Sequence, residues 1–129
     1  MKGIDPEIRE YIRRINSYSG VRTRWSCAGH AVKGAKPDVI HPGGKYYPPY
    51  VSLRFADLEK FEAFIGAMLE KVGKGVSLLI PREKECDVYG DPSIFKRYYR
   101  RWQTLIKQLE RERKLIFGGV LEALEKARG

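Results

Sequence analysis

Eight consecutive positions, from Thr23 to His30, hold the side chains best suited to chemistry. A thiol and an imidazole can act as a nucleophile and its base, so Cys27 and His30 are candidate catalytic residues. Thr23 and Ser26 add hydroxyl groups, and Gly29 permits a ligand to approach the backbone, so these three are candidate ligand-binding residues. The side chains of two residues three positions apart at the end of a strand often point in different directions. Acyl transfer by Cys27 and His30 is therefore a less favoured hypothesis than ligand binding at this turn. The structural alternative is a small buried cysteine, a turn glycine and a surface histidine.

A longer run extends this segment: Ile15-Asn16, then Gly20-Val21, then Thr23-x-x-Ser26-Cys27-Ala28-Gly29-His30. It resembles the wybutosine-synthesis methyltransferase family that modifies tRNA, in which a threonine precedes a Ser-Cys-Ser-Gly-Arg run. The resemblance covers about sixteen of the 129 residues. It implies a tRNA-modifying enzyme that uses S-adenosylmethionine, with the threonine, serine, cysteine and glycine of the motif at the methyl donor or the modified base. His30 replaces the family's arginine and Ala28 its second serine, so a non-catalytic relative is the alternative.

The cysteines and histidines also raise the question of a metal. Cys27, His30, His41 and Cys86 are all the residues of these two types in the chain, and two of each can form a tetrahedral zinc site. Their spacing is poor, because the second half of the set is scattered along the chain. We therefore expect no bound metal.

Basic charge is concentrated at the two ends of the chain, which has a net charge of +9. Segment 95–103 interleaves basic residues with four aromatics, and helical spacing sends the aromatics to a core face. The basic residues of this segment then lie on the solvent-facing side. Together with two arginines of segment 21–27, they are candidate contacts for RNA phosphates, tRNA included. The alternative is that these charged residues only form a solvent-exposed surface and bind no RNA. The candidate nucleic-acid residues are Arg22, Arg24, Lys96, Arg97, Arg100 and Arg101.

The length and composition favour a single α+β domain over residues 1–129, because 43% hydrophobic residues suffice for one core. No apolar run approaches the roughly 20 residues that cross a bilayer, and the start lacks a signal peptide, so we expect no membrane contact. Two cysteines do not make a disulfide framework, which favours the cytoplasm.

The periodicity predicts a mixed or antiparallel sheet of three or four strands, covered on one face by helices and followed by a long C-terminal helix. Asp5 is expected to cap the first helix and Asp57 the second. A polar connection is expected at 83–90, a long loop at 31–49, and a kink or break at Gly118-Gly119. The expected helices span 6–16, 57–73 and 94–124, and the expected strands span 21–27, 50–55 and 76–80.

The long C-terminal helix also supports a second functional hypothesis. Its apolar stripe near Leu105, Leu109 and Ile116 could be buried against a second chain. The protein would then be a dimerising interaction module, either zinc-stabilised or metal-free.

Overall fold

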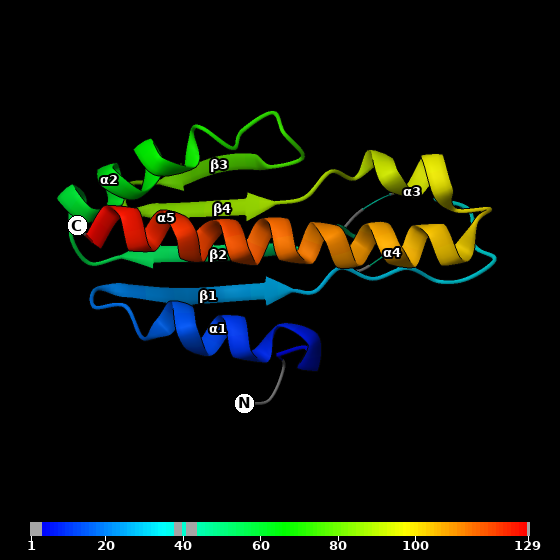
Figure 1. Cartoon of the computed structure of the whole chain (residues 1–129), viewed down its shortest axis with the longest axis horizontal. Helices are drawn as coiled ribbons and strands as arrows, with labels where there is room; N and C mark the ends of the chain where they lie inside the picture. Colours follow the sequence, from blue (N-terminus) through cyan, green and yellow to red (C-terminus); the bar gives the residue numbers. More distant parts are fainter. Residues whose placement is uncertain (1–3, 38–39, 41–43, 129) are drawn as a thin grey trace.

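A computed structural model describes residues 4–37, 40 and 44–128 of the chain (Figure 1). Asp57 accepts a hydrogen bond from the amide of Lys60, as its predicted capping role requires. The elements are η1 (Pro6–Ile8), α1 (Arg9–Asn16), β1 (Val21–Cys27), β2 (Tyr50–Phe55), α2 (Leu58–Met68), β3 (Ser77–Arg82), β4 (Glu85–Tyr89), α3 (Ser93–Tyr98), α4 (Trp102–Arg113), η2 (Lys114–Gly118) and α5 (Gly119–Arg128).

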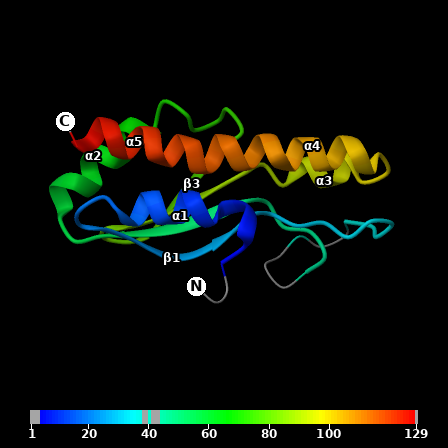
Figure 2. The same cartoon turned by 60° about the horizontal axis from the view of Figure 1, so that its bottom comes forward.

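The four strands form one antiparallel sheet in the order β1-β2-β4-β3. The helices lie on one side of this sheet, and its strands form the other side of the molecule (Figure 2). The predicted α+β class, with a small antiparallel sheet and a long C-terminal helix, is therefore confirmed.

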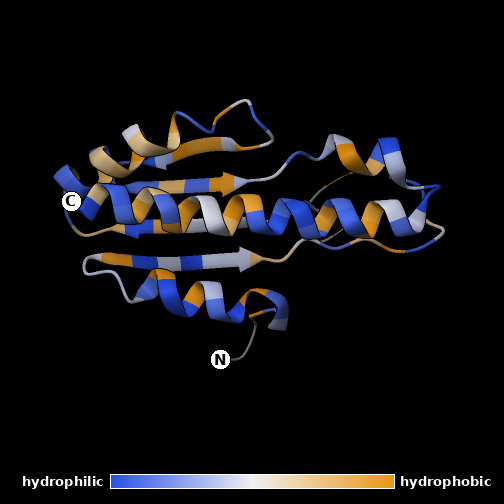
Figure 3. Ribbon diagram, viewed as in Figure 1, coloured by the Kyte–Doolittle hydropathy of each residue, from blue (hydrophilic) through white to orange (hydrophobic). Residues whose placement is uncertain are grey.

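The main core lies between the sheet and the helices. Val51, Leu53 and Phe55 alternate along β2, so all three point to the same side, where they are buried. Hydrophilic residues recur along the outer side of α4 and α5 (Figure 3). Buried partners of the three strand residues include Ile12, Ile15, Phe61, Phe64, Met68, Ile116, Phe117, Val120 and Leu124.

Segment 83–90 contains strand β4 and is not the polar connection that its composition suggested. Cys86 and Val88 are fully buried in the main core, whereas Glu85 and Asp87 alternate with them and point to the other face of the sheet. The prediction was wrong because charged residues fill the outer positions of a strand whose inner positions are only two.

The apolar stripe at the C-terminus is divided between two helices. Residues 99–101 form a turn, and α4 then begins at Trp102 and continues through η2 and α5. Periodicity missed the turn because apolar residues keep helical spacing across it. The helix does not break at Gly118-Gly119, where a kink or break was expected: helical structure continues from Trp102 to Arg128, through the π-helical turn η2, which ends at the first glycine. No helix in the described part of the chain is long and apolar enough to cross a membrane.

A second apolar cluster holds the end of the molecule where α3 and the start of α4 meet the loop after β1 (Figure 1). We call this end, formed by the described residues of 31–46 and 92–109, the tip. The hydroxyl of Tyr46 lies within hydrogen-bond distance of the carbonyl oxygens of Val32 and Ala35, and its single proton, given to either, fastens the loop. The buried residues of this cluster are Tyr46, Ile94, Phe95, Leu105 and Leu109.

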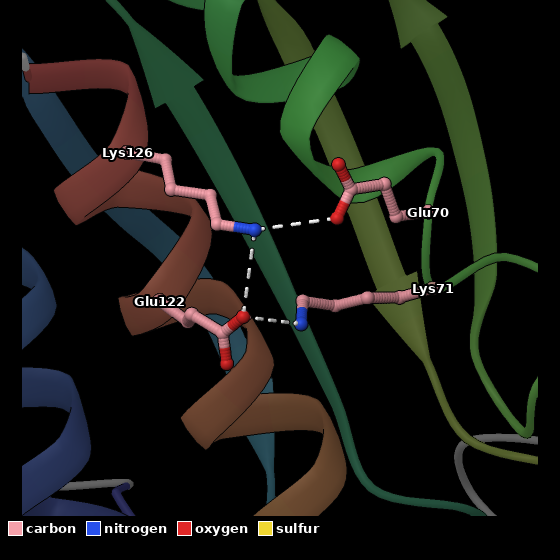
Figure 4. A network of polar contacts seen from close by, with 4 residues as sticks. All are labelled: Glu70, Lys71, Glu122 and Lys126. Carbon is pink, nitrogen blue, oxygen red and sulfur yellow. Dashed lines mark hydrogen bonds and ion pairs between the residues drawn. The ribbon is translucent and has the colours of Figure 1, made fainter.

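Charged side chains join α5 to the residues that follow α2 (Figure 4). Lys71 Nζ lies 3.0 Å from Glu122 Oε1, and Lys126 Nζ lies 3.2 Å from Glu70 Oε2. Solvent screens ion pairs at the surface, so these contacts add little to the stability of the fold.

The three residues named for the predicted dimer surface on the C-terminal helix are buried within their own chain. Leu105 and Leu109 are buried in the cluster at the tip, and Ile116 is buried in the main core. All three side chains are therefore covered by their own chain, and dimerisation through them loses its basis.

Candidate functional site

The turn after β1 places the candidate catalytic residues at one end of the sheet. Cys27 ends β1 and is paired with Tyr50, the first residue of β2. His30 then pairs with Tyr47 through two backbone hydrogen bonds of 3.0 Å. The turn is thus paired on both of its sides with segment 47–50 of the same chain.

The thiol of Cys27 and the imidazole of His30 face each other, with Sγ 3.6 Å from Nδ1. The expectation that they would point apart is wrong, because the turn at Gly29 brings them together. On the far side of the ring, Nε2 lies 3.0 Å from the carbonyl oxygen of Gly44, which can only accept. Nε2 therefore donates, and Nδ1 of the neutral ring is left to accept the thiol proton. This is the arrangement of a nucleophile and its base.

Gly29 is required by the turn itself. Its φ is +84°, and a Cβ at this position would lie 2.9 Å from the ring of Pro49. Its amide also lies 3.4 Å from Cys27 Sγ, toward which it donates. The glycine thus serves close packing within the chain, in addition to any ligand that approaches it.

An open pocket of about 380 Å³ lies at this turn. Besides the turn, its lining includes Asp5, Glu7, Ser26, Tyr47 and Tyr50. Two carboxylates face it, and no lysine or arginine of the described chain lines it. Such a pocket suits a cationic or hydrogen-bond-donating ligand better than a phosphate.

Burial raises the pKa of the Cys27 thiol above its usual range. The amide of Gly29 and the guanidinium of Arg113 lower this pKa. The carboxylates of Asp5 and Glu7 raise it. Burial therefore favours the protonated thiol of Cys27 over the thiolate.

Two residues distant in sequence hold the turn. Asp5 Oδ2 accepts a hydrogen bond of 2.8 Å from the amide of Ala28, and Arg113 Nε donates to the carbonyl oxygen of Ala28 at 2.6 Å. Asp5 makes no side-chain cap to the first helix, contrary to prediction, because its carboxylate is turned to Ala28. No local pattern pointed to Arg113, since the contact spans 85 residues.

Glu112 supports the neighbouring strand end. It is buried, and its Oε2 accepts a hydrogen bond of 3.0 Å from the amide of Asp91, while Oε1 has no partner in the described structure. Burial raises the pKa of this carboxyl to about 7. A Cβ on Gly90 would lie 2.5 Å from Oε1, so a larger residue there would require the Glu112 side chain to move. Gly90 in turn donates to the carbonyl oxygen of Pro49, which packs on the turn.

The two hydroxyl residues of the motif lie in different places. Ser26 lines the pocket, whereas Thr23 lies apart from it and is bound to Asn16. Asn16 donates to Thr23 Oγ1 and accepts from the Thr23 amide, both at 2.9 Å, which ties α1 to β1. The register shift at Arg24 leaves the two hydroxyl side chains on the same face of the sheet, because Thr23 pairs with Leu53 and Ser26 with Val51, and Thr23 lies farther from the pocket along β1.

The four-residue zinc set is not assembled. Cys27 is paired with Tyr50 and Cys86 with Leu53, and these two β2 positions point to opposite faces of the sheet. Cys86 is fully buried, and burial raises its pKa to about 12. His41 lies outside the described residues.

The six candidate nucleic-acid residues form two separate groups. Arg22 and Arg24 belong to β1, and the other four lie on the tip. Arg24 is paired with Glu85 at 2.7 Å, and its guanidinium lies 4.4 Å from the centre of the Trp25 ring. Arg22 is exposed and has no ion pair among the described residues.

At the tip, Lys96, Arg97, Arg100 and Arg101 are all exposed. Within the described ranges, none of them has a carboxylate partner. Arg100 donates to the hydroxyl of Tyr99 at 3.0 Å and lies over its ring. The aromatics of this segment are partly core, as predicted, since the half-buried Tyr99 packs against the tip cluster.

A solved structure has a similar fold. The chain is similar to the structure of PH1069 protein from Pyrococcus horikoshii, with a TM-score of 0.54 and with 95% of this chain and 82% of that chain covered. The two sequences are 15% identical, so the likeness shows the fold alone. No protein-family model and no curated protein matches the chain.

Proposed function

We propose that this is an RNA-associated protein that contacts RNA phosphates through its tip and holds a small molecule or a modified base in the pocket beside Cys27 and His30. The observation that carries the proposal is the one-sided charge of the tip. Residues 92–109 include no acidic side chain. Exposed basic residues on described parts of the tip are Lys33, Lys36, Lys45, Lys96, Arg97, Arg100, Arg101 and Lys107.

This charge favours a polyanion, because unpaired cations on one surface create a local positive field. Lys36 and Lys96 line a common surface depression, so the loop and α3 present their charges together. Some cations elsewhere on the molecule are instead held in ion pairs. Lys71 and Lys126, for instance, are neutralised by carboxylates of the helix layer.

The pocket supports a role in RNA modification. The resemblance to the wybutosine-synthesis methyltransferase family falls on the turn whose thiol and imidazole are in contact. A non-catalytic relative would keep the pocket and the tip and lack the reaction.

S-adenosylmethionine is the cofactor that this resemblance implies, and the pocket's chemistry fits it. The carboxylates of Asp5 and Glu7 and the rings of Tyr47 and Tyr50 are groups that hold an organic cation such as its sulfonium. The cofactor supplies a methyl group to a nucleophile. The chain's own contribution is to orient that cation and to move a proton between Cys27 and the imidazole.

The tip is tested by binding of tRNA at several salt concentrations. A variant with K96Q, R97Q, R100Q and R101Q should bind more weakly and show a salt slope smaller by about one unit for each phosphate that it no longer neutralises. The matched control carries R9Q, R14Q, K74Q and R111Q, which remove four exposed charges outside the tip. Equal weakening in both variants, or wild-type binding no tighter than that of another basic domain, would overturn the proposal.

The pocket is tested with S-adenosylmethionine in a calorimeter. Wild-type protein should bind it more tightly than S-adenosylhomocysteine, which lacks the positive charge, and E7Q should reduce that preference. C27S and H30Q should leave tRNA affinity unchanged while abolishing modification. Equal binding of the two compounds would exclude a charge-selective cofactor site.

A cytoplasmic location belongs to the same proposal. Both cysteines are free thiols, and they lie on opposite faces of the sheet, where they cannot form a bridge.

A further inference from the structure

The side of the sheet turned away from the helices carries an ordered array of side chains, which we call the outer face. Cross-strand register sets its rows, because paired residues point to the same side. One row runs from Trp25 through Ser52 to Asp87. It is flanked along the strands by a row that contains Arg22 and Arg54 and, in the opposite direction, by a row that begins at Cys27.

Trp25 is the aromatic platform of this face. It remains 56% exposed even though the Arg24 guanidinium lies over its ring. An indole this exposed presents a large apolar surface to solvent, and stacking on a planar ligand would remove that surface from water. Trp25 therefore offers a stacking site beside the pocket.

The centre of the face has polar groups without partners. Ser52 is fully buried, and neither its Oγ nor Asp87 Oδ1 has a hydrogen-bond partner in the described structure. The two residues are cross-strand neighbours. Both atoms are closed to solvent, so the polar edge of a base would reach them only after the side chains that cover them had moved.

The neighbouring row supplies positive charge. Arg22 and Arg54 are paired directly across β1 and β2, and both are exposed. Like charges in this position destabilise a sheet. Glu85 is the cross-strand neighbour of Arg54 on β4, but its carboxylate is ion-paired with Arg24, and no carboxylate of the described chain makes an ion pair with Arg22 or Arg54. An anion between the two guanidinium groups would offset their repulsion.

We propose that single-stranded RNA lies across the outer face, with one base stacked on Trp25 and a phosphate between Arg22 and Arg54. The strand then leads toward the pocket at Cys27, one row away. This rests on the proposed RNA association and adds the surface and the strandedness of the RNA. The bases of a duplex are paired and stacked on one another, so they are not free to stack on Trp25.

Fluorescence tests the stacking directly. The chain has two tryptophans, so W102F leaves Trp25 as the only reporter. Titration with an unstructured ten-nucleotide RNA should quench Trp25 emission, and a hairpin of equal length should not. In the reciprocal variant W25F the remaining Trp102 lies on the tip and reports RNA bound there, so only the W102F titration reads stacking on the outer face.

Affinity measurements test the two rows. W25A should weaken binding of the single strand by about tenfold, and W25F should weaken it less, because a phenyl ring still stacks. R22Q with R54Q should weaken it more than the charge-matched control R9Q with R14Q on α1. Circular dichroism and thermal unfolding confirm that each variant is folded.

The outcomes separate this inference from the proposed function. If wild-type protein binds RNA but W25A and the double arginine variant match the control, the outer-face inference fails and the RNA association stands. Equal affinity for hairpin and single strand would also overturn the inference alone. If wild-type protein binds no RNA better than another basic domain, the proposed function fails and the inference falls with it.

Discussion

Arg113 Nε donates to the carbonyl oxygen of Ala28 at 2.6 Å, which ties the middle of the C-terminal helix to the turn between Cys27 and His30. Arg113 Nη2 also lies 3.5 Å from the carbonyl oxygen of Gly29. Two consecutive carbonyl groups of the turn are therefore aimed at one guanidinium. The position of the candidate catalytic pair depends on this helix as well as on the sheet.

Replacing Arg113 by glutamine should destabilise the protein, because the partly buried turn loses a charged donor. The expected decrease is about 1–3 kcal/mol in the free energy of unfolding, measured with urea. R111Q, which removes an exposed charge two residues away, should change stability by less than about 0.5 kcal/mol. Equal stability of the two variants would show that the turn does not need the guanidinium.

Several elements of the fold followed from local patterns. β1 and β2 were predicted because alternating side chains separate an inner from an outer face. β4 was missed because two of its outer positions, Glu85 and Asp87, are acidic, and only Cys86 and Val88 face the main core, so a window of five residues carries little signal. The break at 99–101 was missed because periodicity records which face is apolar and says nothing of whether the backbone is continuous.

Gly29→Ala should be more destabilising than Gly34→Ala, although both glycines have a φ of +84°. A Cβ on Gly34 meets nothing within 4 Å, so G34A carries only the cost of the left-handed backbone, about 1–2 kcal/mol. A Cβ on Gly29 would lie 2.9 Å from Pro49, and such overpacking adds roughly 1–3 kcal/mol. Thermal unfolding of both variants gives the comparison. A smaller effect in G29A would mean that Pro49 moves away freely.

The two cysteines should differ in their reaction with iodoacetamide. Cys86 is fully buried with its pKa raised to about 12, so it should react only after unfolding. Burial also raises the pKa of Cys27, so this thiol should react slowly at pH 7 and faster as the pH rises. Mass spectrometry of the labelled peptides, with urea-unfolded protein as the control, measures both rates. Fast labelling of Cys27 at pH 7 would indicate a preformed thiolate.

The candidate site was only partly visible in the sequence. Cys27, Gly29 and His30 are close in the chain, and the motif named them together. Asp5 and Arg113 reach the same turn from remote segments, and a charged residue on a helix has no pattern that separates a brace from a surface charge. Their roles follow from how the helix crosses the sheet, which is a property of the tertiary fold.

Glu112 should make the stability of the protein depend on pH near neutrality. Its pKa is raised by burial from an ordinary 4.5 to about 7, so between these values the folded state binds a proton that the unfolded state lacks. The contribution of Glu112 to the free energy of unfolding is therefore greatest below about pH 4.5, and it is lost as the pH rises through 7. The shift corresponds to at most about 3 kcal/mol.

Glu112→Gln isolates this contribution, because glutamine keeps an acceptor for the Asp91 amide and does not ionise. Urea unfolding between pH 5 and pH 8 should show wild-type stability declining relative to that of E112Q, with most of the change below pH 7. The contributions of ionisable groups that both proteins share cancel in the difference between their free energies of unfolding. E110Q, an exposed neighbour on the same helix, should run parallel to the wild type. If E112Q also runs parallel to the wild type, the Glu112 carboxylate stays ionised in the folded state, and the partnerless Oε1 must be solvated.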